Sequence, residues 1–200
     1  MEEQFSAVKF QTIFVGSEPP VDPKIAELKK WCREFHDRKL ARPHKRGSFG
    51  NLSFRDSGDS FVITGSGVRF GDEWVDNPFV KVNSCDLEKM LVYAEGTRDP
   101  SSESLMHYSV YRARPDVGAV FHGHSREILD RAEELGLTQT ITEEPYGSAS
   151  LARSIIEVLD EKYLIVLKGH GFLSLGATME DAGELACRTQ DLTRGKADGR

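Results

Sequence analysis

The chain has 200 residues, of which 38% are hydrophobic and 29% charged, and a formal net charge of −6. This composition is that of one ordinary globular domain rather than a disordered chain, and the acidic balance argues against binding nucleic-acid phosphates by bulk electrostatics. No stretch has the ~20 apolar residues of a membrane-spanning helix, and the acidic start MEEQ is unlike a secretory signal, so we expect a cytoplasmic protein with no membrane or nucleic-acid partner.

The first half of the chain predicts one helix followed by several strands. Residues 1–23 contain two adjacent prolines and no sustained period, so we expect an N-terminal extension on the surface or against a neighbouring subunit. From Lys24, apolar residues recur at steps of three and four and predict a helix to about Leu40. The short basic run ARPHKR that follows is interpreted as a solvated turn. Short β-branched or aromatic runs then predict strands at 52–55, 61–63 and 79–82.

The second half mixes helices and strands. Turn and cap residues predict helices over 103–114, 125–136 and 150–159 and a last helix after Thr178, while apolar runs predict strands at 117–121, 163–167 and 172–175. We therefore predict an α/β protein of the α+β type, with one domain over residues 24–193. Its central sheet is expected to be mainly antiparallel or mixed and flanked by helices, and the polar tail 194–200 to be frayed.

Three histidines form the strongest chemical pattern. His122 and His124 flank Gly123 at the end of a predicted strand, where alternate residues share a face and two imidazoles can bind one ion. The pair alone is also compatible with polar residues that cap a strand. His170 lies between two glycines after another apolar strand, where it is either a turn residue or a third ligand. Three ligands would leave a position for substrate, as in catalytic zinc sites.

Five motifs in order resemble the class II aldolase/adducin family. They are GNLS (50–53), TGSG (64–67), PSSE (100–103) with a histidine after it, RPDVGAVFHGH (114–124) and GHG (169–171). The resemblance covers about residues 24–193, and the subgroup most similar by motif is that of the L-fuculose-1-phosphate aldolases. It implies a single domain with a mainly antiparallel sheet and a homo-oligomer, with a fourfold tetramer favoured.

The resemblance also assigns residues. It implies that His122, His124 and His170 bind zinc, or another divalent ion such as Mn²⁺, Co²⁺ or Fe²⁺, and that Glu103 is the catalytic acid or base. Without the resemblance, the favoured interpretation of Glu103 is a carboxylate that stabilises the start of a helix. The substrate phosphate is expected at backbone and hydroxyl groups of three loops, which separately are ordinary turns and caps: Gly50, Asn51, Ser66, Gly67, Ser101 and Ser102.

The implied reaction is zinc-dependent aldol cleavage of a phosphorylated ketose into dihydroxyacetone phosphate and an aldehyde through a metal-stabilised enediolate. The tyrosine that the resembling aldolases use for a second proton transfer has no clear counterpart here. The family therefore leaves open a sugar-acid phosphate decarboxylase, a dehydratase or a pentulose-phosphate 4-epimerase. A non-catalytic, adducin-like binding module is disfavoured because all three histidines and Glu103 are present.

Overall fold

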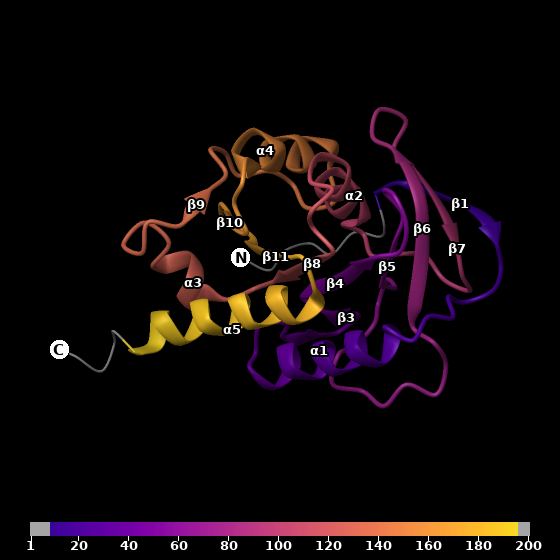
Figure 1. Ribbon diagram of the computed structural model, residues 1–200, viewed down its shortest axis with the longest axis horizontal. Helices are drawn as coiled ribbons and strands as arrows, with labels where there is room; N and C mark the ends of the chain where they lie inside the picture. The colour runs from indigo at the N-terminus through magenta and orange to yellow at the C-terminus, as the bar shows by residue number, and fades with distance from the viewer. Residues whose placement is uncertain (1–8, 196–200) are drawn as a thin grey trace.

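The fold is built on a mixed β-sheet, seen in the computed structural model, which describes residues 9–195 (Figure 1). Within these residues the sheet has nine strands in the order β1-β7-β6-β5-β4-β8-β11-β10-β9. Neighbours pair antiparallel except β1 with β7 and β9 with β10, which pair parallel. The strands are β1 (Gln11–Gly16), β4 (Gly50–Arg55), β5 (Phe61–Thr64), β6 (Phe79–Asp86), β7 (Leu91–Glu95), β8 (Ala119–Gly123), β9 (Thr138–Gln139), β10 (Leu164–Leu167) and β11 (Gly171–Gly176).

Helices cover both faces of the sheet. The helices are α1 (Ile25–Asp37), α2 (Ser104–Ala113), α3 (Arg126–Asp130), α4 (Ala149–Leu159) and α5 (Met179–Gly195), and a small hairpin joins β2 (Pro43–His44) to β3 (Gly47–Ser48). Figure 1 shows α1 and α5 on one side of the sheet and α2 and α4 on the other. The predicted α/β single domain with a mixed sheet flanked by helices is therefore confirmed.

Strand alternation explains the two layers, because successive side chains of a strand point to opposite faces. In β8, Phe121 packs with α1 and α5, whereas Val120 packs with α2 and α4. Helix α1 contributes an apolar stripe at helical spacing to the first core, with Leu28, Cys32 and Phe35 fully buried. None of the helices between residues 9 and 195 combines the length and apolar character that crossing a lipid bilayer requires.

Several predicted boundaries were wrong. The helix expected over 125–136 ends at Asp130, because the following turns lead the chain to β9 and Arg131 donates to the carbonyl of Thr193 in α5. The strand expected at 117–121 runs from Ala119 to Gly123, since its pairing with β4 and β11 continues that far. Helix α2 begins one residue later than expected, at Ser104, which makes Glu103 its N-cap residue.

Five strands were not predicted: the short strands β2, β3 and β9, and the longer strands β1 and β7. β1 lies in the segment expected as an extension, and β7, its parallel partner, lies far along the chain. Residues 1–8 of that segment and residues 196–200 of the tail expected to be frayed lie outside the described residues. Helix α5 continues through Gly195, so the described part of the tail is helical.

Strand register brings the chemically interesting residues to one place. Gly123, at the end of β8, pairs with Gly50 at the start of β4 and with Phe172 near the start of β11. Residue 122 therefore faces Asn51 across one pair of strands, and the turn that carries His170 lies beside the same strand end.

Candidate metal centre

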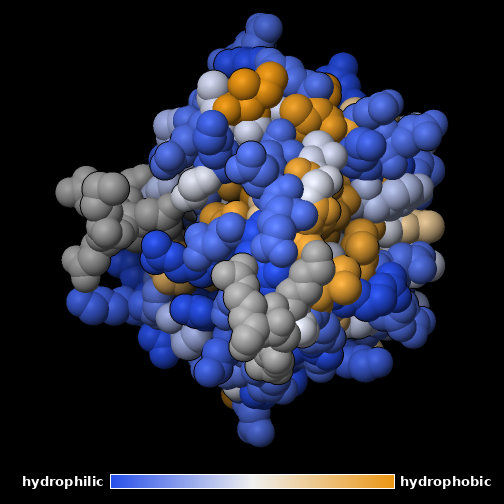
Figure 2. Space-filling model, turned by 90° about the vertical axis from the view of Figure 1, so that its left-hand side faces the viewer, coloured by the Kyte–Doolittle hydropathy of each residue, from blue (hydrophilic) through white to orange (hydrophobic). Residues whose placement is uncertain are grey.

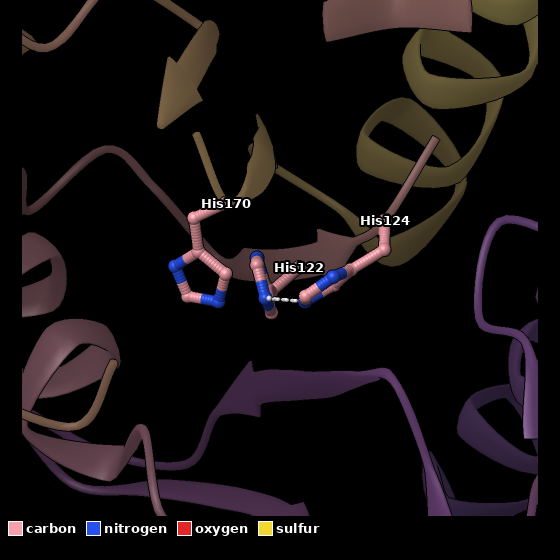
Figure 3. A group of neighbouring side chains, drawn as sticks. All are labelled: His122, His124 and His170. Atoms are coloured by element: carbon pink, nitrogen blue, oxygen red, sulfur yellow. Dashed lines mark hydrogen bonds between the residues drawn. The ribbon is translucent and has the colours of Figure 1, made fainter. Parts of the chain in front are cut away.

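Three imidazole rings converge where β4, β8 and β11 meet. His122 is the fourth residue of β8, His124 follows the strand, and His170 lies in the tight turn between β10 and β11. One ring nitrogen from each lies within 4.8 Å of the others, a group that can hold a metal ion. Figure 3 shows the three rings side by side, with His170 coming from a separate segment of chain.

His122 is oriented by the sheet. Its Nδ1 lies 3.0 Å from the carbonyl oxygen of Phe172, and because a carbonyl only accepts, Nδ1 carries the hydrogen. In a neutral ring, Nε2 then presents a lone pair, 3.0 Å from Nε2 of His124 and 3.1 Å from Oε2 of Glu103. A lone pair next to a carboxylate is unfavourable unless a positive charge lies between them, so this geometry fits a bound cation.

The other two rings are kept in the form that binds metals. Burial lowers the pKa of His124 well below its usual range, and the neighbouring His122 and His170 lower it further. Burial likewise lowers the pKa of His170 to about 4. Both rings are therefore neutral near pH 7, which is the ligand form of imidazole.

Glu103 faces the same space from the start of α2. Its Oε1 lies 3.3 Å from Nε2 of His170, and its Oε2 accepts a hydrogen bond of 2.8 Å from the side-chain amide of Asn51. Burial raises the pKa of this carboxyl group, but its interactions with the adjacent His122 and His170 outweigh this effect, and the pKa lies well below its usual range. Oε1 is buried and accepts no hydrogen bond from residues 9–195. Glu103 is therefore an ionised carboxylate with one oxygen anchored and one free.

The six residues expected to bind phosphate line one cleft. The cleft also contains Glu103, His124 and His170, while His122 lies fully buried behind it. Two of its three loops are tied together, since Gly65 bridges to Pro100 and the amide of Ser66 donates to the carbonyl of Asp99. The residues from these loops are Gly50, Asn51, Ser66, Gly67, Ser101 and Ser102.

Backbone conformation and side-chain contacts indicate which groups of these loops can contact a ligand. Gly50 and Gly67 have φ angles of 121° and 77°, a region that favours glycine and lets the backbone approach a ligand closely. The Asn51 amide donates to Glu103, and its oxygen lies 2.6 Å from Nε2 of His107, so of these side-chain groups only the second amide hydrogen remains for a ligand.

Arg46 and Tyr146 are among the cleft residues that the sequence analysis did not assign to the site. Arg46 belongs to the basic run interpreted as a solvated turn, yet it lines the cleft together with Ser66 and Ser102. Tyr146 also lines it, and the Lys9 ammonium lies 3.9 Å from the centre of the Tyr146 ring. The basic run was the signal for Arg46, but only the β2–β3 hairpin brings that residue to the site.

Comparison with known proteins gives a consistent result. The family model described as Class II Aldolase and Adducin N-terminal domain matches residues 26–194. The chain is 29% identical over 174 residues to an L-fuculose phosphate aldolase of Methanococcus maripaludis, covering 79% of this chain and 87% of that protein. It is 30% identical over 185 residues to a 5-methylthioribulose-1-phosphate/5-deoxyribulose-1-phosphate aldolase of Escherichia coli, covering 84% and 81%. A solved L-fuculose 1-phosphate aldolase has the same fold, with a TM-score of 0.69, 24% identity and 92% of each chain covered.

Proposed function

The chain belongs to the class II aldolase and adducin family, and on this premise we propose that it is a metal-dependent aldolase that cleaves a phosphorylated ketose into dihydroxyacetone phosphate and an aldehyde. Its relatives indicate an enzyme of the lyase type. The observation that carries the proposal is the convergence of three imidazole nitrogens and the Glu103 carboxylate at a cleft lined with serines and glycines.

We propose that His122, His124 and His170 hold a divalent ion, with zinc favoured among the ions that accept imidazole ligands. The donor set fits this role because His122 has its Nδ1 hydrogen-bonded to a carbonyl and His124 and His170 are neutral. When bound, such an ion supplies positive charge that stabilises the negative charge developing on substrate oxygens.

Glu103 is the proposed proton carrier. In the direction of synthesis, Oε1 takes a carbon-bound proton from dihydroxyacetone phosphate, the freed electron pair attacks the aldehyde carbon, and the aldehyde oxygen takes up a proton. Cleavage runs these steps in reverse, so Glu103 returns the proton to carbon after the carbon–carbon bond breaks. Oε1 suits this work because it lies beside His170 and accepts no hydrogen bond from residues 9–195.

The substrate phosphate is assigned to the loops around Gly50, Ser66 and Ser102. Glycine backbone N–H groups and serine hydroxyls are donors suited to an anion, and Arg46 adds a positive charge to the lining of the same cleft. Phosphorylated ketoses are also the substrates named for the relatives, an L-fuculose phosphate in one case and 5-deoxyribulose 1-phosphate in another.

We further propose a homo-oligomer, with a tetramer favoured. Figure 2 shows the end of the molecule where α3, β9 and the C-terminal part of α5 lie, with hydrophobic groups exposed among hydrophilic ones. Exposed apolar side chains of this region include Ile141 after β9 and Leu192 in α5, 69% and 60% accessible. Sedimentation equilibrium tests the proposal, which predicts the mass of four chains and is contradicted by the mass of one.

A substrate panel tests the reaction. The metal-loaded protein is offered L-fuculose 1-phosphate, 5-deoxyribulose 1-phosphate, their unphosphorylated sugars and a set of sugar-acid phosphates. The proposal predicts release of dihydroxyacetone phosphate from a ketose 1-phosphate and much slower turnover of the free sugar. Release of carbon dioxide, loss of water or conversion to an epimer would instead identify one of the other activities open to the family. Metal binding with no turnover of any compound would favour a binding module.

A further inference from the structure

A row of buried polar side chains runs from Glu103 into the core between α2 and β4. Glu103, His107 and Tyr111 are spaced by four residues along α2 and so share one face of the helix. Asn51 and Ser53 are alternate residues of β4 and share one face of the strand. The two spacings match, because four helical residues rise about 6 Å and two strand residues about 6.8 Å.

The five side chains are joined by one continuous series of hydrogen bonds, which we call the ladder. The Asn51 amide lies 2.8 Å from Oε2 of Glu103, and its oxygen lies 2.6 Å from Nε2 of His107. Nδ1 of His107 lies 2.7 Å from the Ser53 hydroxyl, which lies 2.8 Å from the Tyr111 hydroxyl. All five side chains are buried, and those of Ser53, His107 and Tyr111 are fully so.

The hydrogen-bond chemistry fixes the direction of every bond. Because the Asn51 nitrogen donates to Glu103, its oxygen is the acceptor for His107, and Nε2 of His107 therefore carries a hydrogen. Burial lowers the pKa of His107 to about 3, so the ring is neutral and Nδ1 accepts from Ser53 at 2.7 Å, which is closer than the other acceptor for that hydrogen, the Val120 carbonyl oxygen at 3.3 Å. Ser53 in turn accepts from Tyr111. All the donors thus point toward the carboxylate, which favours its ionised form.

We propose that His107 is a positioning residue that acts through Asn51 to hold Oε2 of Glu103 and leave Oε1 free for proton transfer. The inference rests on the proposed function, since it takes Glu103 as the proton carrier. Asn51 alone could rotate about its side chain, and an amide that turned over would present its oxygen to the carboxylate. The Nε2–H of His107 prevents this, because it needs an acceptor where the Asn51 oxygen now lies.

The test compares His107→Leu, which removes the donor, with His107→Gln, whose amide can reach Asn51 as Nε2 does. The probe is exchange of carbon-bound hydrogen of dihydroxyacetone phosphate with deuterium oxide, followed by proton NMR on the metal-loaded protein. His107→Leu is expected to slow exchange at saturation by about 10–100-fold with metal content unchanged, and His107→Gln to restore most of the rate. Ser109→Ala is the matched control, because it removes a buried 2.9 Å bond to Leu105 on the same helix and should not slow exchange.

A mutant cycle separates positioning from a merely structural role. In the Glu103→Gln background, His107→Leu should cost no more than about twofold, since a residue that acts through Glu103 has nothing left to position. An exchange rate in His107→Leu equal to that of the wild-type protein would overturn the inference. So would a double variant whose rate loss equals the product of the losses in the two single variants. If His107→Leu does not fold, the exchange rate of His107→Gln and the NMR measurement described next decide whether His107 positions Glu103.

The protonation of the His107 ring nitrogens tests the ladder by a measurement that does not depend on enzyme activity. Nitrogen-15 NMR of the wild-type protein should show His107 neutral, with Nε2 protonated and Nδ1 unprotonated, between pH 5 and 8. A charged ring or the opposite tautomer would overturn the inference. If the wild-type protein exchanges no hydrogen at all, the proposed function fails, and the tautomer still decides whether the ladder is as described.

Discussion

At the scale of single residues, the site depends on how a few polar atoms are shared. Glu103 has two chemically equivalent oxygens, but Asn51 and His122 contact Oε2, whereas Oε1 lies 3.3 Å from Nε2 of His170 and accepts no hydrogen bond from residues 9–195. His124 and His170 face an opposite constraint, because burial lowers their pKa values and keeps the two rings neutral, the form that binds a cation. A carboxylate and three imidazoles that share one space form a site that suits a divalent ion, because the ion adds positive charge beside the carboxylate.

The buried neutral His107 makes a prediction about pH. Its pKa is about 3 in the folded protein and near 6.5 when unfolded, so below pH 6.5 the unfolded chain binds the extra proton and stability falls as the pH falls. We expect His107 to cost the wild-type protein about 2 kcal/mol of unfolding free energy between pH 7.5 and pH 5. Denaturant unfolding of the wild-type protein and His107→Gln at both pH values measures this, because glutamine does not titrate. An equal loss in both proteins would contradict the assignment.

At the scale of elements, the site exists because three strands end together. His122 is held by the pairing of β8 with both β4 and β11, and the close contact of β8 with β11 depends on Gly171. A Cβ added at Gly171 would lie 2.5 Å from the carbonyl oxygen of Gly123 and 2.8 Å from Cε1 of His122. A side chain larger than hydrogen therefore has to move the strand that carries the ligands.

Gly171→Ala tests this dependence. We expect metal affinity to fall by about 10–100-fold and the protein to lose about 1–3 kcal/mol of stability, since both β8 and His122 must shift. The matched control is Gly195→Ala at the end of α5, where an added Cβ meets no atom within 4 Å. Metal titration by calorimetry compares the two variants. Unchanged affinity in Gly171→Ala would show that strand spacing does not position the ligand.

Local pattern explains which elements were predicted from the sequence. The helix at 25–37 and the strands before His122 and His170 show clear apolar periods, so the three histidines could be placed at strand ends. β1 was missed because its pairing partner in the sheet, β7, is distant in the sequence. The early end of α3 reflects a contact between Arg131 and α5, which no local pattern reveals.

The residues of the candidate site, like the secondary-structure elements, were predictable only in part. The resemblance indicated the three histidines, Glu103 and the phosphate loops, and the structure brings all of them to one cleft except His122, which lies buried beside the other two histidines. The bonding of the Asn51 side chain was not predictable, because it depends on the register of β4 against α2. His107 belonged to one of the family motifs but had no role until its contacts were known.

At the scale of the whole molecule, metal binding should be coupled to stability. The ligands come from β8 and from the β10–β11 turn, so an ion that binds them stabilises the folded sheet and not the unfolded chain. An ion at 100 times its dissociation constant adds about 2.7 kcal/mol, which corresponds to a rise in Tm of roughly 5–10 °C for a chain of this size. Thermal unfolding with zinc and with a chelator measures it. His124→Ala with His170→Ala should abolish the rise, and an equal rise in that variant would place the ion elsewhere.

The most direct test of the central claim is hydrogen exchange by Glu103→Gln. The substitution keeps the size of the side chain and all three histidines but removes the ionisable carboxylate, so metal content should match that of the wild-type protein. The metal-loaded wild-type protein should exchange carbon-bound hydrogen of dihydroxyacetone phosphate with deuterium oxide, and Glu103→Gln should do so ~10²–10⁴-fold more slowly. Near wild-type exchange by Glu103→Gln at full metal content would contradict the account, because the proton would then be carried by another group.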